Sequence, residues 1–211
     1  MARGRSAGYD DQRDLILTQA AQLFARRGYS ATSMNEVAQA CGLSKATLYH
    51  YYKDKYSLLF SIADGHVSRL VALVHNDEMQ RLHGEARLRA MIHAIVGEYA
   101  NAQNAHRVLT DDVRFLEPDD RQQVLDKERQ VVANCAAAVV ELRPALAGAQ
   151  LQKPLTMLLC GMVNWMFTWM RPDGCISHAD MGRMAADLFI GGLDQVQLPT
   201  AQHAAPATTL A

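Results

Sequence analysis

The stretch Ser33–Tyr52, SMNEVAQACGLSKATLYHYY, has the proportions of two short helices joined by a tight turn. Ser33 and Glu36 have the spacing of a capping box, which predicts the start of the first helix. Gly42 allows the chain to turn sharply, and Ser44 can cap the second helix. This arrangement is a helix-turn-helix, a motif whose second helix can enter the major groove of DNA.

The outward positions of this motif suit contact with duplex DNA. Val37, Leu43 and Leu48 are spaced to face inward, so polar side chains are left on the other face. Lys45 can reach a phosphate or a guanine, and Thr47 suits a phosphate oxygen or a thymine methyl. Backbone N–H groups at helix N-termini also attract phosphate. The candidate DNA contacts are therefore Thr32, Ser33, Ser44, Lys45, Ala46, Thr47, Tyr49, His50 and Lys55. On spacing alone, a small helical hairpin with a solvated face remains the alternative.

The rest of the chain also has helical spacing, and no alternating stretch is long enough to predict a strand. The sequence predicts an all-α protein of about nine helices. It divides into a disordered arm at 1–10, a helix-turn-helix domain at 11–55, a larger helical domain at 56–197 and a disordered tail at 198–211. We expect the helices over about 11–27, 33–41, 45–51, 55–76, 84–104, 106–115, 119–142, 153–171 and 178–191.

The charge of the chain is uneven along its length. Of 211 residues, 21 are Lys or Arg and 22 are Asp or Glu, which gives a net charge of −1. Residues 1–55 hold eight basic and five acidic residues, a local net charge of +3, so the remainder carries −4. A basic end on an acidic body indicates that only this end faces a polyanion.

Several classes of protein are disfavoured by what the sequence lacks. No secretory signal is apparent, and the apolar run 155–170 is too short to span a bilayer. The eight His are scattered and no catalytic motif is present, so we expect no enzyme, no metal site and no cofactor. Free thiols in a reducing cytoplasm are expected, because CxxC and metal-ligand spacings are absent among Cys41, Cys135, Cys160 and Cys175.

The run Gly28–Lys55 closely resembles the signature of the TetR (tetracycline repressor) family. That signature is roughly G-aromatic-x-x-T-S/T-x-x-x-I/V-A-x-x-A-G-V/L-S-x-x-x-L/I-Y-x-H/Y-F-x-x-K, and nearly every position matches. Cys41 stands where the family usually has Ala, and Tyr52 stands where it usually has Phe. Both residues keep the compact, buried character of the family's positions.

The resemblance implies a homodimeric repressor. Its two recognition helices would enter successive major grooves about 34 Å apart on a palindromic operator. Residues 56–197 would then be the ligand-binding and dimerisation domain, with the last two long helices in a four-helix interface between the copies. A small-molecule effector bound there would release the DNA through the helix that starts near Lys55 and packs on both domains. Activation rather than repression remains open.

The segment 153–171 is apolar on nearly all sides, so it has no solvated face. It can serve a dimer interface with one face and a ligand pocket with the other, and plain core packing is the simpler alternative. Gly161 and Cys160 leave space beside Trp165, and Asn164 is a polar group that needs a partner. The candidate effector-binding residues are His93, Tyr99, Phe115, Cys160, Gly161, Asn164, Trp165 and Thr168.

The segment Gly161–Gly174 has a narrower resemblance. It looks like the G-M-x-N-W-x-x-x-W-aromatic-R-P-x-G stretch of TetR regulators that sense acyl-coenzyme A (acyl-CoA) thioesters, although Met170 replaces the usual aromatic residue. This implies an acyl-CoA effector, with phenylacetyl-CoA the first candidate and a medium or long fatty acyl-CoA the second. The alternative is a multidrug-type repressor that senses lipophilic cations, for which Glu98 is the candidate carboxylate. Residues that could pair with the coenzyme's phosphates are Arg107, Arg114 and Arg171.

Overall fold

The computed structural model describes residues 7–171 and 174–198, and all regular structure in this part of the chain is helical. Of the twelve α-helices there, nine are longer than five residues, which confirms the all-α prediction and its helix number. The helices are α1 (Ala7–Arg27), α2 (Met34–Ala40), α3 (Lys45–Tyr51), α4 (Lys55–His75), α5 (Asp77–Arg81), α6 (Gly84–Asn101), α7 (Gln103–Asp112), α8 (Pro118–Leu142), α9 (Ala145–Gly148), α10 (Gln152–Asn164), α11 (Met166–Trp169) and α12 (His178–Leu193), with a 3₁₀ turn, η1 (Val113–Phe115), after α7.

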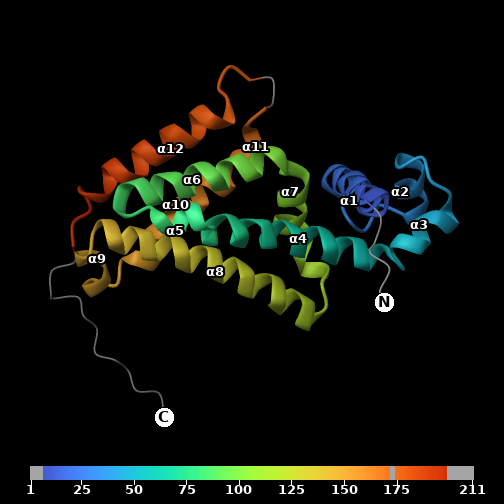
Figure 1. Ribbon diagram of the computed structural model, residues 1–211, viewed down its shortest axis with the longest axis horizontal. Coiled ribbons are helices and arrows are strands. Elements are labelled where there is room, and N and C mark those ends of the chain that lie inside the picture. The colour runs from blue at the N-terminus through green and yellow to red at the C-terminus, as the bar shows by residue number, and fades with distance from the viewer. Residues whose placement is uncertain (1–6, 172–173, 199–211) are drawn as a thin grey trace, which may run out of the picture.

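Helices α1–α3 form a head at one end of the molecule, and α4 leads from this head into a larger helical body (Figure 1). In the body, α8 packs along α4, α6 packs on α12, and α10 packs on α8. Two hydrophobic cores result. One joins the head to α4, α7 and the first turns of α8, and the other lies among α6, α8, α10 and α12.

Several helix ends lie a few residues from those expected, and two regions differ more substantially from the prediction. Helix α1 begins at Ala7, so the expected arm is wrong for residues 7–10, where the Tyr9 ring stacks on Tyr51 at 4.8 Å and holds the first turn against α3. The remaining residues of the arm, and the tail beyond Leu198, lie outside the described residues. The single helix expected over 153–171 is interrupted at Trp165. The amide and hydroxyl of Thr168 both donate to the Trp165 carbonyl, a tighter bonding pattern that ends the regular helix.

Helix α4 contributes to both cores. Leu58, Leu59 and Ile62 are buried in the head cluster, whereas Leu70 and Val74 are buried in the body cluster. By length and composition, the stretch from α4 through α5 passes for a membrane span. Eight residues of α4 are buried, and all but His66 belong to the two hydrophobic cores, where the helix links head and body.

A pair of buried histidines lies where the two cores meet. His66 of α4 is fully buried and His106 of α7 is 3% exposed, with 3.3 Å between His66 Nε2 and His106 Nδ1. Burial lowers the pKa of each ring to about 4, and the neighbouring ring adds to this effect at His106. Both rings are therefore neutral at pH 7, and the Tyr99 ring stacks on His106 at 3.8 Å.

This histidine pair should make the protein sensitive to mild acid. An unfolded His takes up a proton near pH 6.5, whereas the folded pKa values are about 4. The unfolded state therefore binds more protons between these values, and the free energy of unfolding falls as the pH is lowered from 6.5 to 4. The slope is about 1.4 kcal/mol per pH unit for each proton by which the two states differ.

Urea unfolding followed by circular dichroism at stepped pH measures this slope. The double variant His66→Gln/His106→Gln should have a flatter dependence than the wild type, and the exposed His50→Gln is the matched control. A double variant whose slope equals that of the wild type would contradict the assignment.

Candidate functional site

The helix-turn-helix of α2 and α3 is shaped by local signals. Ser33 forms the expected capping box with Glu36, and the Ser44 hydroxyl accepts from the Thr47 amide at 3.1 Å. Gly42 takes a positive φ of 66° in the turn, a conformation that costs glycine little. Val37 and Leu48 are fully buried, as their spacing predicts.

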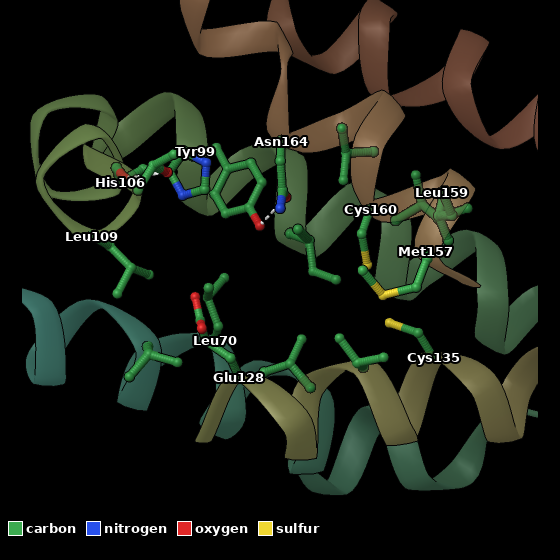
Figure 2. Close-up of a pocket in the computed structure, with 17 residues that line it drawn as sticks. Leu70, Tyr99, His106, Leu109, Glu128, Cys135, Met157, Leu159, Cys160 and Asn164 are labelled. Atoms are coloured by element: carbon green, nitrogen blue, oxygen red, sulfur yellow. Dashed lines mark hydrogen bonds between the residues drawn. The ribbon is translucent and has the colours of Figure 1, made fainter. Parts of the chain in front are cut away.

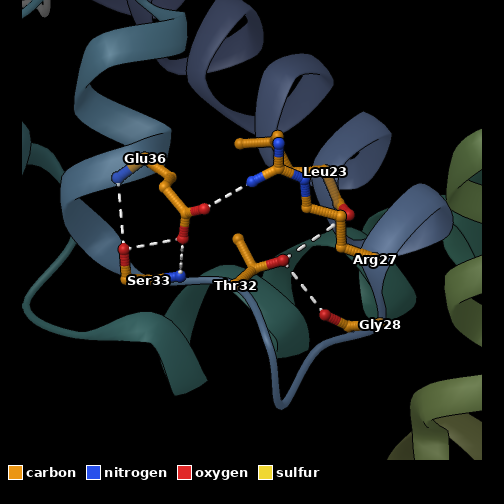
Figure 3. Close-up of polar contacts among 6 residues, drawn as sticks. All are labelled: Leu23, Arg27, Gly28, Thr32, Ser33 and Glu36. Atoms are coloured by element: carbon orange, nitrogen blue, oxygen red, sulfur yellow. Dashed lines mark hydrogen bonds and ion pairs between the residues drawn. The ribbon is translucent and has the colours of Figure 1, made fainter.

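The N-terminal end of α2 is fastened to α1 (Figure 3). The carboxylate of Glu36 pairs with Arg27 and accepts from the Ser33 amide at 2.8 Å, and the bonds to Ser33 hold its pKa below the usual range. The Thr32 hydroxyl donates to the Gly28 carbonyl at 3.0 Å, and the residue is 2% exposed. Thr32 is therefore a buried connector of α1 and α2, and the expectation that it contacts DNA is wrong for its side chain.

The predicted outward face of α3 is exposed. All five expected side chains, and the two capping serines, reach solvent: Ser33, Ser44, Lys45, Ala46, Thr47, Tyr49 and His50. The Lys45 ammonium lies 5.8 Å from the Tyr49 ring, and the Thr47 hydroxyl lies 2.8 Å from that of Ser44. This face thus presents a cation, hydroxyls and flat polar rings together, with Tyr9 and Tyr51 stacked beside His50.

Lys55 has a different role from the one expected. Its ammonium donates to the carbonyls of Tyr29 at 2.8 Å and Ser30 at 3.2 Å, and it lies 4.4 Å from the centre of the Tyr29 ring. These contacts fasten the loop after α1 to the start of α4. The cation is engaged inside the head, so it is not a free phosphate contact.

The body encloses an apolar cavity of about 200 Å³ among α4, α6, α7, α8 and α10 (Figure 2). Of the expected effector-binding residues, Tyr99, Cys160 and Asn164 line it. The Tyr99 hydroxyl donates to Asn164 Oδ1 at 2.7 Å, so Asn164 has a partner within the protein. Burial raises the pKa of both Tyr99 and Cys160.

The other five expected residues do not line this cavity: His93, Phe115, Gly161, Trp165 and Thr168. Cys160 and Asn164 are one helical turn apart and both border the cavity, although Asn164 is also exposed to solvent. Gly161, Trp165 and Thr168 are exposed and do not border it, with Trp165 66% exposed. His93 packs beside Gly182 of α12, and Phe115 packs on the Tyr29 ring at 5.4 Å. An all-apolar helix gives no sign of which face is the inner one.

The carboxylate in this cavity is Glu128, which the sequence interpretation missed. It makes no hydrogen bond or ion pair with the described residues, and burial raises its pKa. The buried stripe of α8 could have revealed Glu128. This stripe includes Val124, four residues before Glu128, and Val131 and Cys135, three and seven residues after it. Glu98, the expected candidate, does not line this cavity and is paired with Arg69, with 2.7 Å between Oε1 and Nε.

A groove of about 630 Å³ lies beside the cavity, between α1 and α7–α8. Its lining includes Arg107 and Arg114, two of the three cations expected near a ligand, together with Arg121; Arg171 is not part of it. None of the three forms an ion pair with the described residues. Asp111 and Asp112 also line the groove, so it holds charges of both signs. Thr110 lines both the cavity and the groove, so the apolar cavity and the arginine-bearing groove adjoin.

Comparison with known proteins matches two family models to separate parts of the chain. A family model for bacterial regulatory proteins of the tetR family matches residues 16–62, and one for the tetracyclin repressor-like C-terminal domain matches residues 81–193. Among curated relatives, FasR of Mycolicibacterium smegmatis, an HTH-type transcriptional activator, is 26% identical over 200 residues, which cover 93% of this chain and 89% of FasR.

Solved structures show the same architecture. A TetR-family transcriptional regulator from Bordetella parapertussis is 32% identical with a TM-score of 0.75, and the match covers 88% of this chain and 97% of that one. AibR, crystallised in complex with isovaleryl coenzyme A and operator DNA, shares the fold at 24% identity with a TM-score of 0.70, covering 84% of this chain and 97% of that one. The protein described here thus belongs to the TetR family of bacterial transcriptional regulators.

Proposed function

We propose that this regulator represses transcription in the cytoplasm as a homodimer on a palindromic operator, and that an acyl-CoA thioester releases it. The observation that carries the effector class is the junction at Thr110, where an apolar cavity adjoins a groove with three unpaired arginines. An acyl-CoA combines the same two chemistries, since it joins an apolar acyl group to a phosphate-bearing coenzyme. Arginine recognises phosphate through charge-assisted, often bidentate hydrogen bonds.

The size of the cavity favours a small acyl group. A volume of about 200 Å³ is below the range typical of drug-sized ligands, so phenylacetyl or a short to medium fatty acyl group fits better than a long one. AibR gives a precedent within the same fold, because it was crystallised with isovaleryl coenzyme A. The phosphates would then occupy the groove between α1 and α7.

The route from ligand to DNA follows from packing. Helices α4 and α7 both contribute residues to the cavity wall, and both also pack on α1 in the head. A ligand that binds more tightly when these helices are differently spaced favours the head orientation that goes with that spacing. The size of the shift is set by the difference between its affinities for the two conformations. In a dimer, such a shift changes the distance between the two α3 helices.

The exposed face of α3 gives the first test of this function. Lys45→Ala should weaken binding to operator duplexes about tenfold, because one cation that reaches phosphate or a guanine edge is lost. The measurement is fluorescence anisotropy on a duplex selected from random DNA by the wild-type protein. Arg81→Ala, on α5 outside the head, is the matched control and should bind normally. Equal affinities for the Lys45 and Arg81 variants would count against this face.

The dimer is expected to form through α10 and α12. The apolar residues Leu158, Trp165 and Leu188 of this region are each at least 66% exposed in the single chain, and large exposed apolar side chains are typical of interaction surfaces. Leu158→Asp with Leu188→Asp should convert the dimer to a monomer, because each copy would bury uncompensated charge. Size-exclusion chromatography with light scattering reports the mass. Leu15→Asp, at an exposed position of α1, should leave a dimer, and a dimeric double variant would rule out this interface.

The arginine groove gives the test of the effector class. Arg107→Ala with Arg114→Ala should weaken phenylacetyl-CoA binding by about tenfold or more, because charge-assisted hydrogen bonds to phosphate are lost. Isothermal titration calorimetry measures the affinity, and Arg81→Ala again serves as the control. If the double variant binds as tightly as the control, the groove does not hold the coenzyme.

The second candidate function keeps the DNA-binding half and replaces the effector by a lipophilic cation. The observation in its favour is Glu128, since an unpartnered carboxylate in an apolar cavity attracts a cation. Parallel titrations with phenylacetyl-CoA and with the cationic dye rhodamine 6G, each scored by release of operator DNA, separate the two candidates. Release by the dye alone would establish the second.

A further inference from the structure

The polar groups of the cavity are divided between two opposite walls. On one side, Glu128 of α8 has no hydrogen-bond partner among the described residues, and its exposed neighbour Arg129 pairs with Asp126 instead. On the other side lie the hydrogen-bonded side chains of Tyr99 and Asn164 (Figure 2). The space between these walls is bordered by aliphatic residues such as Ile95, Val131 and Val163.

Each wall offers a defined hydrogen-bonding capacity. The Glu128 carboxylate accepts hydrogen bonds. The Tyr99 hydroxyl gives its proton to Asn164 Oδ1, so the Tyr99 oxygen can still accept and the Asn164 amide N–H groups can still donate. A purely aliphatic ligand would satisfy none of these groups and would leave the Glu128 carboxylate desolvated without a partner, which is unfavourable.

A hydroxyl group matches this arrangement better than a cation does. A hydroxyl can donate to Glu128 on one wall or accept from the Asn164 amide on the other. A buried cation would need extra stabilisation, such as an open aromatic face. The Tyr99 ring does not offer one freely, because it stacks on His106 at 3.8 Å, and the walls beside Glu128 are aliphatic.

We propose that the effector is a hydroxyacyl thioester, whose hydroxyl group donates to Glu128, and that Glu128 determines this specificity. The inference rests on the proposed function, because it assigns the acyl group of the thioester to this cavity. The coenzyme still binds in the groove between α1 and α7, and the hydroxyl group belongs to the acyl end of the ligand in the cavity. A hydrogen bond to a carboxylate should improve affinity about tenfold over the plain acyl chain.

Calorimetric titration of the full-length protein tests the proposal with three matched probes: octanoyl-CoA, 3-hydroxyoctanoyl-CoA and 8-hydroxyoctanoyl-CoA. At least one hydroxylated probe should bind the wild type about tenfold more tightly than octanoyl-CoA. Glu128→Leu should abolish this preference and bind octanoyl-CoA at least as well as the wild type does. Asp126→Asn, an exposed carboxylate on the same helix, is the control and should keep the preference.

A second variant, Glu128→Gln, keeps a hydrogen-bond acceptor and guards against misfolding of the leucine variant. It should retain part of the hydroxyl preference, with circular dichroism as the check on folding. The proposal is overturned if octanoyl-CoA binds the wild type as tightly as both hydroxylated probes, or if folded Glu128→Leu keeps the preference. It is also overturned if rhodamine 6G binds the wild type and Glu128→Gln abolishes that binding.

If the proposed acyl-CoA sensing is wrong, the titrations give a different result from the one that overturns only the hydroxyl preference. If none of the three thioesters binds the wild type, the acyl-CoA effector class is wrong and the hydroxyl inference falls with it. If octanoyl-CoA binds without a preference for the hydroxyl group, only the inference is lost, and acyl-CoA sensing stands.

Discussion

The burial of α4 on both sides of His66 is the constraint on which the rest of this structure depends. Leu58, Leu59 and Ile62 fix one half of the helix in the head, and Leu70 and Val74 fix the other half in the body. Close packing of this kind does not deform gradually, so we expect a change in the body to reach the head as a rigid displacement. The head is in turn a single unit, because Glu36 and Thr32 fasten α2 and its loop to α1 and Lys55 fastens that loop to α4.

Polar side chains connect the cavity wall to α4 at the point where the two cores meet. Asn164, Tyr99, His106 and His66 follow one another through a hydrogen bond, a ring stack and a short nitrogen–nitrogen contact, from the cavity wall to α4. The two histidines are neutral, and the Glu98 carboxylate, 3.5 Å from His66 Nδ1, is paired with Arg69. A ligand that alters the Tyr99–Asn164 hydrogen bond acts on the ring that packs against His106, one contact from α4.

Local signals in the sequence were sufficient for the fold and for the exposure of most residues that are predicted to contact DNA. Capping residues such as Ser33 and Ser44 act within four residues, and helical periodicity distinguishes Leu48 from Lys45 without reference to the rest of the chain. The errors arose where a contact leaves no periodic trace in the sequence. Thr32 bonds back to Gly28 and Leu23, which lie four and nine residues earlier. Lys55 bonds to a loop 25 residues earlier. In the body, Trp165 and Asn164 are adjacent in an apolar run, and only the packing of α10 on α8 decides which faces the cavity. Glu128 was missed because its charged neighbours suggest a solvated surface.

The engagement of Lys55 by backbone carbonyls also determines how this cation can act on DNA. The carbonyls of Tyr29 and Ser30 are neutral, so the ammonium keeps its full charge while its position is fixed. Among the described residues of the head, the cation that pairs with a carboxylate is Arg27, with Glu36. Release of condensed counterions depends on the number of phosphates neutralised, so Lys55 still adds to the attraction of a duplex. Because its side chain is already ordered before DNA arrives, little of its conformational entropy remains to be lost on binding.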